Sequence, residues 1–347
     1  MNDRRRALAA SAGIVGIFLL VQLGALAVAS PLEAGGNQFV EDTSNPTNSL
    51  VYVLAILVAT VVMLGAFRLG VSRIIRAFVV LSGAYISLFV FRIVFPSVLS
   101  VPVGGTSINL LAWGGAIALG IALYAYPEWY VIDAAGILMG IGAAGLFGIN
   151  FGILPALVLL AVLAVYDAIS VYGTEHMLTL ASGVMEMRVP IVLVIPLSLS
   201  YSFLDSDLPD PESDGEDDTE RPDTRPDDAA PAANGSGESD EGLDLDREAL
   251  FIGLGDAVIP TILVASAGFF LAETPSVPLP GLEVALPAAT AMVGTLAGLV
   301  VLLWMVLQGR AHAGLPLLNG GAIGGYLVGA LASGLSIVEA LGLSGLL

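Results

Sequence analysis

The sequence contains no cysteine, no lysine and only two histidines, His176 and His312. Without cysteine there is no disulfide, no thiol nucleophile and no thiolate metal site. Without lysine there is neither a Schiff-base lysine nor a serine–lysine dyad. The histidines stand in no HExxH zinc motif, and no GxSxG nucleophile motif is present. We therefore expect neither a metal nor a cofactor.

Charged residues are also scarce, at 12%, whereas 56% of the residues are hydrophobic and the mean hydropathy is +0.89. Apolar runs of roughly 17 to 23 residues recur, each long enough to cross a hydrocarbon core of about 30 Å as a helix. We predict an all-α polytopic membrane protein with nine transmembrane helices, at Ala7–Ala29, Leu50–Phe67, Ile74–Phe95, Asn109–Tyr124, Tyr130–Gly148, Phe151–Gly173, Glu248–Leu271, Val284–Leu307 and Gly314–Leu346.

Arginine placement predicts how these helices are oriented. With the N-terminus inside, eleven of the twelve arginines fall on the cytoplasmic side, and Arg92 is the exception. This orientation places the C-terminus outside. The first run follows Arg4 to Arg6 and has features of a signal peptide, but its length favours a retained span.

An acidic segment divides the chain into two membrane parts. Residues 204–246 hold 17 acids and two arginines and are rich in Pro, Gly and Ser, so we expect a disordered cytoplasmic loop. Residues 1–203 then contain helices one to six, and residues 247–347 contain helices seven to nine. The apolar stretch Val189 to Phe203 is short and contains Pro190 and Pro196, so we interpret it as a membrane-surface or re-entrant element, in part extended.

Two acids stand out inside the predicted spans, and acids in hydrocarbon are functional candidates because their burial is costly. Asp167 lies late in the sixth helix and Asp256 early in the seventh, so two antiparallel helices would bring both to one depth. Paired carboxylates suit peptide hydrolysis by general acid–base catalysis. On these residues alone, an ion- or proton-coupled transporter is equally consistent. A scaffold with vestigial acids is the third alternative.

The residues around Asp256 favour access to it. Gly253 and Gly255 remove side chains just before the acid, and Pro260 cannot donate a hydrogen bond to the Asp256 carbonyl. A further acid, Asp133, lies near the inner end of its predicted helix. We interpret it as an interface charge that pairs with Arg68 or Arg76.

Three motifs in order resemble the presenilin and signal-peptide-peptidase family of intramembrane aspartyl proteases. They are Tyr166-Asp167, Gly253-Leu254-Gly255-Asp256 and the stretch Pro316-Leu317-Leu318, where the family has Pro-Ala-Leu. The resemblance implies a nine-helix presenilin-like fold. It also implies catalytic roles for Asp167 and Asp256 and substrate-binding roles for Tyr166, Gly253, Leu254, Gly255, Pro316, Leu317 and Leu318.

By the same resemblance, the substrates would be transmembrane peptides or signal peptides within a lipid bilayer, with no nucleic acid involved. The segments after helix six and before helix seven would hold the substrate as an added strand. The order of the motifs favours the protease over the transporter. The sequence does not indicate an oligomeric state.

Overall fold

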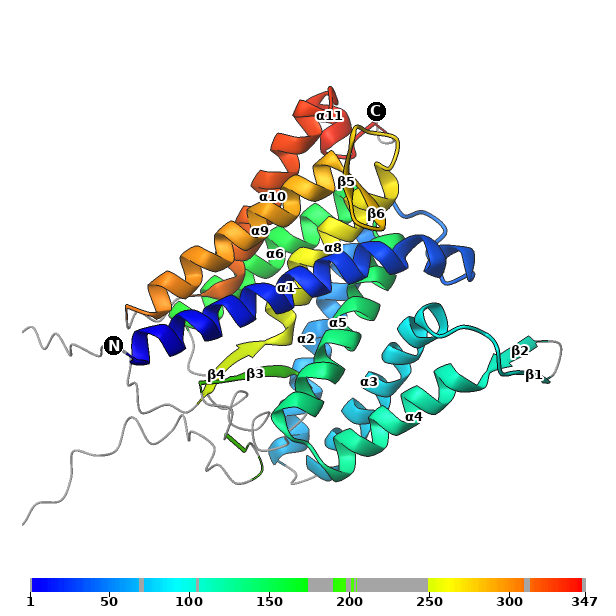
Figure 1. The fold of residues 1–347 in the computed structure, drawn as a ribbon. Coiled ribbons are helices and arrows are strands. Elements are labelled where there is room, and N and C mark those ends of the chain that lie inside the picture. Colours follow the sequence, from blue (N-terminus) through cyan, green and yellow to red (C-terminus); the bar gives the residue numbers. More distant parts are fainter. Residues whose placement is uncertain are drawn as a thin grey trace, which may run out of the picture.

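The computed structural model describes residues 2–68, 72–103, 106–173, 190–197, 201–202, 204, 249–308 and 313–344. Figure 1 shows the helices and the three two-stranded sheets that these residues form. The helices are α1 (Asn2–Ala34), α2 (Thr47–Arg68), α3 (Ser72–Val94), α4 (Leu110–Ala125), α5 (Trp129–Asn150), α6 (Ile153–Gly173), α8 (Leu254–Phe270), α9 (Leu286–Val306), α10 (Gly314–Ala332) and α11 (Ile337–Ala340). The strands are β1 (Ser100–Val103), β2 (Thr106–Asn109), β3 (Val192–Pro196), β4 (Ala249–Gly253), β5 (Ser276–Leu279) and β6 (Leu282–Ala285).

Six helices in the described part of the chain are long and apolar enough to cross a membrane: α1, α3, α5, α6, α9 and α10. The apolar stretches in α2, α4 and α8 are shorter. At 1.5 Å per residue, α4 is about 24 Å long and α8 about 26 Å, less than a hydrocarbon core of about 30 Å. The protein is thus a mostly helical, multi-pass membrane protein, and the number of nine spans stays a prediction.

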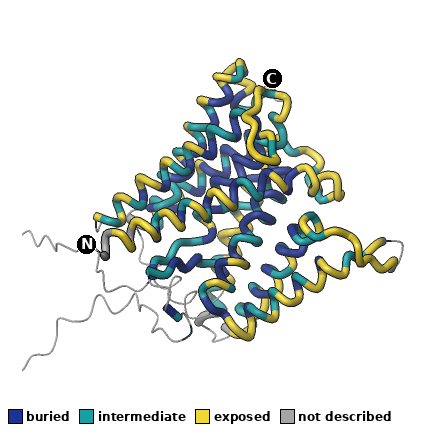
Figure 2. The backbone as a smooth tube through the Cα atoms, viewed as in Figure 1, coloured by how far each residue is buried: buried dark blue, intermediate teal, exposed yellow. Residues whose placement is uncertain are grey.

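Helix α8 lies at the centre of the helical bundle and contacts α1, α5, α6, α9 and α10. Every residue from Thr261 to Ala267 is buried. Figure 2 shows the buried residues gathered in this central region, whereas much of α3 and α4 is exposed. Packing on several sides therefore fixes the position of α8 and of the residues at its N-terminus.

Helices α9 and α10 approach each other through glycines. A side chain at Gly294 would strike the backbone carbonyl of Gly321, and one at Gly298 would strike that of Leu317. Small residues that allow such close backbone contact favour helix association in lipid, where the hydrophobic effect between helices is weak. The first turn of α10 is consequently held in a fixed place beside α9.

Strands β3 and β4 pair antiparallel, with Val192 opposite Gly253 and Pro196 opposite Ala249. The predicted helix Glu248–Leu271 is therefore wrong at its start, because residues 249–253 are extended and α8 begins at Leu254. Five apolar residues show no distinct period, and their partner strand lies far away in the sequence, so local pattern could not reveal the pairing. The extended conformation expected within Val189 to Phe203 is confirmed for β3.

The predicted final helix, Gly314–Leu346, is divided in two. Gly334 has a φ of 86°, a left-handed conformation that ends a helix. Ser336 then caps α11 in a capping box with Glu339. The hydrogen bonds that Ser336 donates, first from its backbone N–H, lower the pKa of the Glu339 carboxyl.

Two hairpins, β1–β2 and β5–β6, connect helices where the sequence indicated only loops. Their strands have four residues each, too few for a clear alternation. The predicted acidic loop, residues 204–246, lies outside the described residues apart from Leu204.

Candidate active site

Asp167 lies on α6, six residues before its last residue, Gly173, and is 9% exposed. Its Oδ2 accepts a hydrogen bond from the backbone N–H of Leu315, at 3.1 Å. Leu315 is the second residue of α10, and the first N–H groups of a helix have no partner within the helix. The N-terminus of α10 also carries a partial positive charge, so it is a favourable neighbour for a carboxylate.

Asp256 is the third residue of α8, and α8 follows β4 directly. The residues just before α8 therefore form an extended strand, where the sequence predicted helical turns. A Cβ atom on Gly253 would lie 3.5 Å from Asp256 Oδ2, and one on Gly314 would lie 3.6 Å from it. The two glycines leave space around this carboxylate, and Asp167 is close enough to act on it electrostatically.

Both acids line one cavity of about 270 Å³. Its walls come from α1, α6, β4, α8, α9 and the start of α10, and its lining residues are Ser11, Ile14, Asp167, Leu250, Phe251, Ile252, Gly253, Asp256, Leu302, Leu303, Val306, Leu307 and Gly314. The contribution of α1 and α9 to the walls could not be predicted from the sequence. Within the described part of the chain, the buried hydroxyl of Ser11 has no hydrogen-bond partner.

Buried polar contacts fix the helices that carry the acids. Asn319 on α10 donates from Nδ2 to the carbonyl of Leu160 on α6, at 2.9 Å. Ser266 on α8 donates to the carbonyl of Phe151, at 2.8 Å. Buried polar groups need such partners because leaving them unpaired is costly. The first contact sets the register of α10 along α6, so that Leu315 reaches Asp167.

Most of the residues expected to bind substrate do not line this cavity. Gly253 lines the cavity, but the other six expected residues are not among its lining residues. Tyr166 is 41% exposed, and Leu254 is packed beneath the site, where it would contact a Cβ added to Gly140. Pro316 and Leu317 are half-buried, and Leu318 is fully buried between α10 and its neighbours.

Asp133 does not form the expected ion pair with Arg76, and the side chain of the other expected partner, Arg68, is not described by the structure. Instead, its Oδ1 accepts a hydrogen bond from the backbone N–H of Val194 in β3, at 2.7 Å. Arg76 donates to the carbonyl of Tyr124, at 3.0 Å, and its guanidinium lies over the Tyr124 ring. The sequence could not reveal this contact, because the partner is a backbone group of a strand 61 residues away.

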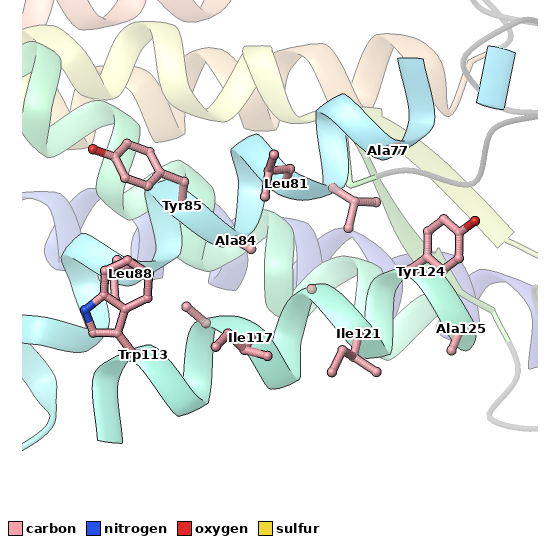
Figure 3. A pocket seen from close by; sticks show the side chains of 13 residues that line it. Ala77, Leu81, Ala84, Tyr85, Leu88, Trp113, Ile117, Ile121, Tyr124 and Ala125 are labelled. Carbon is pink, nitrogen blue, oxygen red and sulfur yellow. The ribbon is translucent and has the colours of Figure 1, made fainter. Parts of the chain in front are cut away.

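A second cavity, of about 570 Å³, lies between α3 and α4 (Figure 3). Its lining is apolar and aromatic and includes no acid. The rim residues Leu81, Ile117 and Ile121 are exposed. This groove offers apolar contact without an acid–base group, so the cavity between Asp167 and Asp256 is the candidate active site.

Comparisons with known proteins identify a protease family. The chain matches the signal-peptide peptidase and presenilin aspartyl protease family over residues 15–335. It is also similar to a presenilin family intramembrane aspartate protease solved in space group C222, with 32% identity over 93% of this chain and 99% of that chain and a TM-score of 0.59. For a presenilin family intramembrane aspartate protease in space group P2, the identity is 34%, the coverage 92% and 97%, and the TM-score 0.58.

No curated protein matches the chain significantly. The likeness to proteases does not favour the transporter that the buried acids alone left open. Asp167 and Asp256 line one cavity of a multi-pass helical protein. The chain therefore belongs to the signal-peptide peptidase and presenilin family of intramembrane aspartyl proteases.

Proposed function

We propose that this protease hydrolyses peptide bonds of transmembrane or signal-peptide helices with Asp167 and Asp256 as its catalytic pair. The observation that carries the proposal is that both carboxylates line one cavity, between β4 and the first turn of α10. Of the Gly253–Asp256 motif, Gly253 and Asp256 line this cavity, and Gly253 has no side chain beside the acid.

In this proposal one aspartate is ionised and the other protonated. The ionised carboxylate takes a proton from a water molecule between them as the water oxygen attacks the scissile carbonyl carbon. The protonated carboxyl gives its proton to the carbonyl oxygen, forming a tetrahedral diol. The C–N bond then breaks as the first aspartate protonates the leaving nitrogen, and a diol hydroxyl returns its proton to the second aspartate.

The direction of the backbone groups in β4 supports substrate binding along one edge of this strand. Leu254 N–H donates to the carbonyl of Ile191, at 2.8 Å, whereas Val194 N–H donates to Asp133 and not to β4. Bonded and non-bonded pairs alternate along an antiparallel ladder. Val194 and Phe251 therefore lie opposite each other without a hydrogen bond between them. The backbone groups of Phe251 point away from β3.

The edge of β4 that faces away from β3 runs beside the cavity, which Leu250 to Gly253 line. We propose that an unwound substrate segment adds to this edge as a third strand. Unwinding matters because a helical peptide keeps its carbonyls in internal hydrogen bonds, where water cannot attack them. The added strand would hold one carbonyl in extended form next to Asp256.

The topology belongs to the same proposal. The N- and C-termini lie at opposite ends of the bundle in Figure 1, as an odd number of crossings requires. We propose nine spans, with the N-terminus and residues 204–246 cytoplasmic and the C-terminus outside. Residues 1–203 and 247–347 would then each supply one catalytic helix.

The test is cleavage of a transmembrane peptide by the purified chain in lipid vesicles. Asp167→Ala and Asp256→Ala should each lower the rate by about a thousandfold or more, because each removes half of an acid–base pair. Asp42→Asn, which changes an exposed acid in a loop, should cleave normally. Normal cleavage by either alanine variant would refute the proposal, and solute uptake without cleavage would favour a transporter.

A further inference from the structure

Asp133 is a buried carboxyl group that the proposed hydrolysis does not use. It lies on α5, is 8% exposed, and accepts the backbone N–H of Val194 at 2.7 Å. An acid inside a membrane helix is costly to keep and is therefore expected to have a task. Its contact with a strand next to the candidate active site suggests what the task is.

Val194 is the middle residue of β3, and its N–H points away from β4. In a two-stranded sheet this outer edge would expose an unpaired donor in a membrane, where no water can satisfy it. Asp133 satisfies that donor. It also blocks the outer edge of β3 at this point, so the substrate strand is directed to β4.

The face of α5 that carries Asp133 is shaped to receive the sheet. Gly136 and Gly140 follow at spacings of three and four residues, so they lie on the same face. A Cβ atom on Gly136 would meet the side chain of Leu193 at 2.9 Å, and one on Gly140 would meet that of Leu254 at 3.5 Å. This face therefore holds β3 and the first residue of α8 closely.

A second acid of α5 forms a hydrogen bond with the chain beyond β3. Glu128, the N-cap of α5, accepts a hydrogen bond from the hydroxyl of Ser202, at 2.7 Å. The N-terminal end of α5 thus holds the chain at Val194 and again at Ser202. Because the chain is held once within β3 and once beyond it, the pairing of β3 with β4 has a fixed position relative to Asp256.

We propose that Asp133 is a positioning residue: by holding β3, it fixes β4 at the register in which an added substrate strand meets Asp256. This inference rests on the proposed function of the same site. Asp133 touches neither the substrate nor the reacting atoms. Its loss should therefore weaken substrate docking without removing the chemistry of the aspartate pair.

The kinetic test compares Asp133→Leu, which lacks an acceptor, with Asp133→Asn, which keeps one. Asp133→Leu should raise KM for a transmembrane peptide by about tenfold, with kcat changed less than about twofold, because a buried donor loses its partner. Asp133→Asn should restore most of the wild-type KM. Ile141→Val, a change elsewhere on α5, is the matched control and should leave both constants unchanged.

A small hydroxyl-containing mimic of the tetrahedral diol, too short to reach β4, serves as a second probe. Its affinity should stay within about twofold of wild type in every variant, since the aspartate pair is intact. A parallel loss of mimic binding and cleavage in Asp133→Leu would mean that the site has collapsed, and would overturn a positioning role. Equal defects in Asp133→Asn and Asp133→Leu would also contradict it.

Amide hydrogen exchange provides a readout that needs no activity. Asp133→Leu should accelerate exchange in residues 190–197 and 249–253 by about tenfold, and Val194→Pro added to it should cause little further change. Unchanged exchange would overturn the inference even if cleavage is confirmed. Conversely, cleavage that survives loss of Asp167 or Asp256 would refute the proposed function and leave the exchange result interpretable.

Discussion

The carboxylate of Asp167 accepts a hydrogen bond from the backbone N–H of Leu315, at 3.1 Å, so the first turn of α10 holds an acid of α6. The preceding residue, Gly314, lies against the other acid, because a Cβ atom there would be 3.6 Å from Asp256 Oδ2. One peptide unit of α10 thus borders both carboxylates. We infer that backbone atoms at the start of α10 hold both carboxylates in position.

A larger residue at position 314 should impair catalysis. Gly314→Val would place methyl groups between Asp256 and Leu302, where a Cβ atom alone already lies 3.3 Å from the Leu302 side chain. We expect kcat/KM to fall by about 10- to 100-fold, because the acid and its water lose their geometry. Gly320→Ala is the matched control on α10, since a Cβ atom there meets open space. Equal activity of the two variants would contradict this assignment.

Ser11 should contribute to substrate binding and not to stability. Its hydroxyl lines the cavity, and in the described residues it has no hydrogen-bond partner. Removal of an unsatisfied buried group costs little, so Ser11→Ala should leave the melting temperature unchanged. We expect KM to rise by about three- to tenfold if the hydroxyl bonds the substrate backbone. A lower melting temperature with unchanged KM would assign the hydroxyl a structural role.

Proline substitutions in β4 should separate substrate docking from sheet stability. Phe251→Pro removes an N–H on the cavity side of the strand, whereas Leu250→Pro removes one that points toward β3. Both variants should cleave a transmembrane peptide more slowly, by about tenfold or more. Both variants lose apolar packing, but Leu250→Pro should lower thermal stability more, because it alone breaks the backbone pairing with β3. Unchanged turnover in Phe251→Pro would refute strand addition at this edge.

Leu317 replaces the alanine of the family motif, and its substitution tests whether it narrows the substrate groove. The side chain is half-buried and does not line the cavity. Leu317→Ala should therefore cost roughly 1–2 kcal/mol of stability, less than a fully buried leucine. Cleavage rates of small and bulky substrates should change by less than about threefold. A large gain for bulky substrates at unchanged stability would show that Leu317 limits the groove.

The sequence predicts most helices because an apolar run of membrane-spanning length has few alternatives in lipid. It also predicts the two acids, since carboxyl groups such as Asp167 and Asp256 stand out in apolar helices. The residue pattern did not predict strand β4, because its five apolar residues look like the first turns of the helix that follows, and only the family resemblance pointed to a strand there. Only pairing with β3, which is distant in sequence, makes them extended.

The walls of the cavity could not be predicted for a related reason. Leu302 and Val306 on α9 line it, yet an apolar residue that faces a cavity has the same character as one that faces lipid. The contact of Asp133 with Val194 involves a backbone donor, which carries no sequence signal. Such features depend on how helices rotate against each other, and that is set by contacts such as those of the glycines between α9 and α10.

The most direct test of the central claim is the single-turnover cleavage rate of Asp167→Asn, Asp256→Asn and the double variant, with folding checked by thermal unfolding. If the two acids act as one catalytic pair, all three variants should share one residual rate, about a thousandfold or more below wild type. Independent contributions that multiply in the double variant, or cleavage that survives either single substitution, would contradict the account.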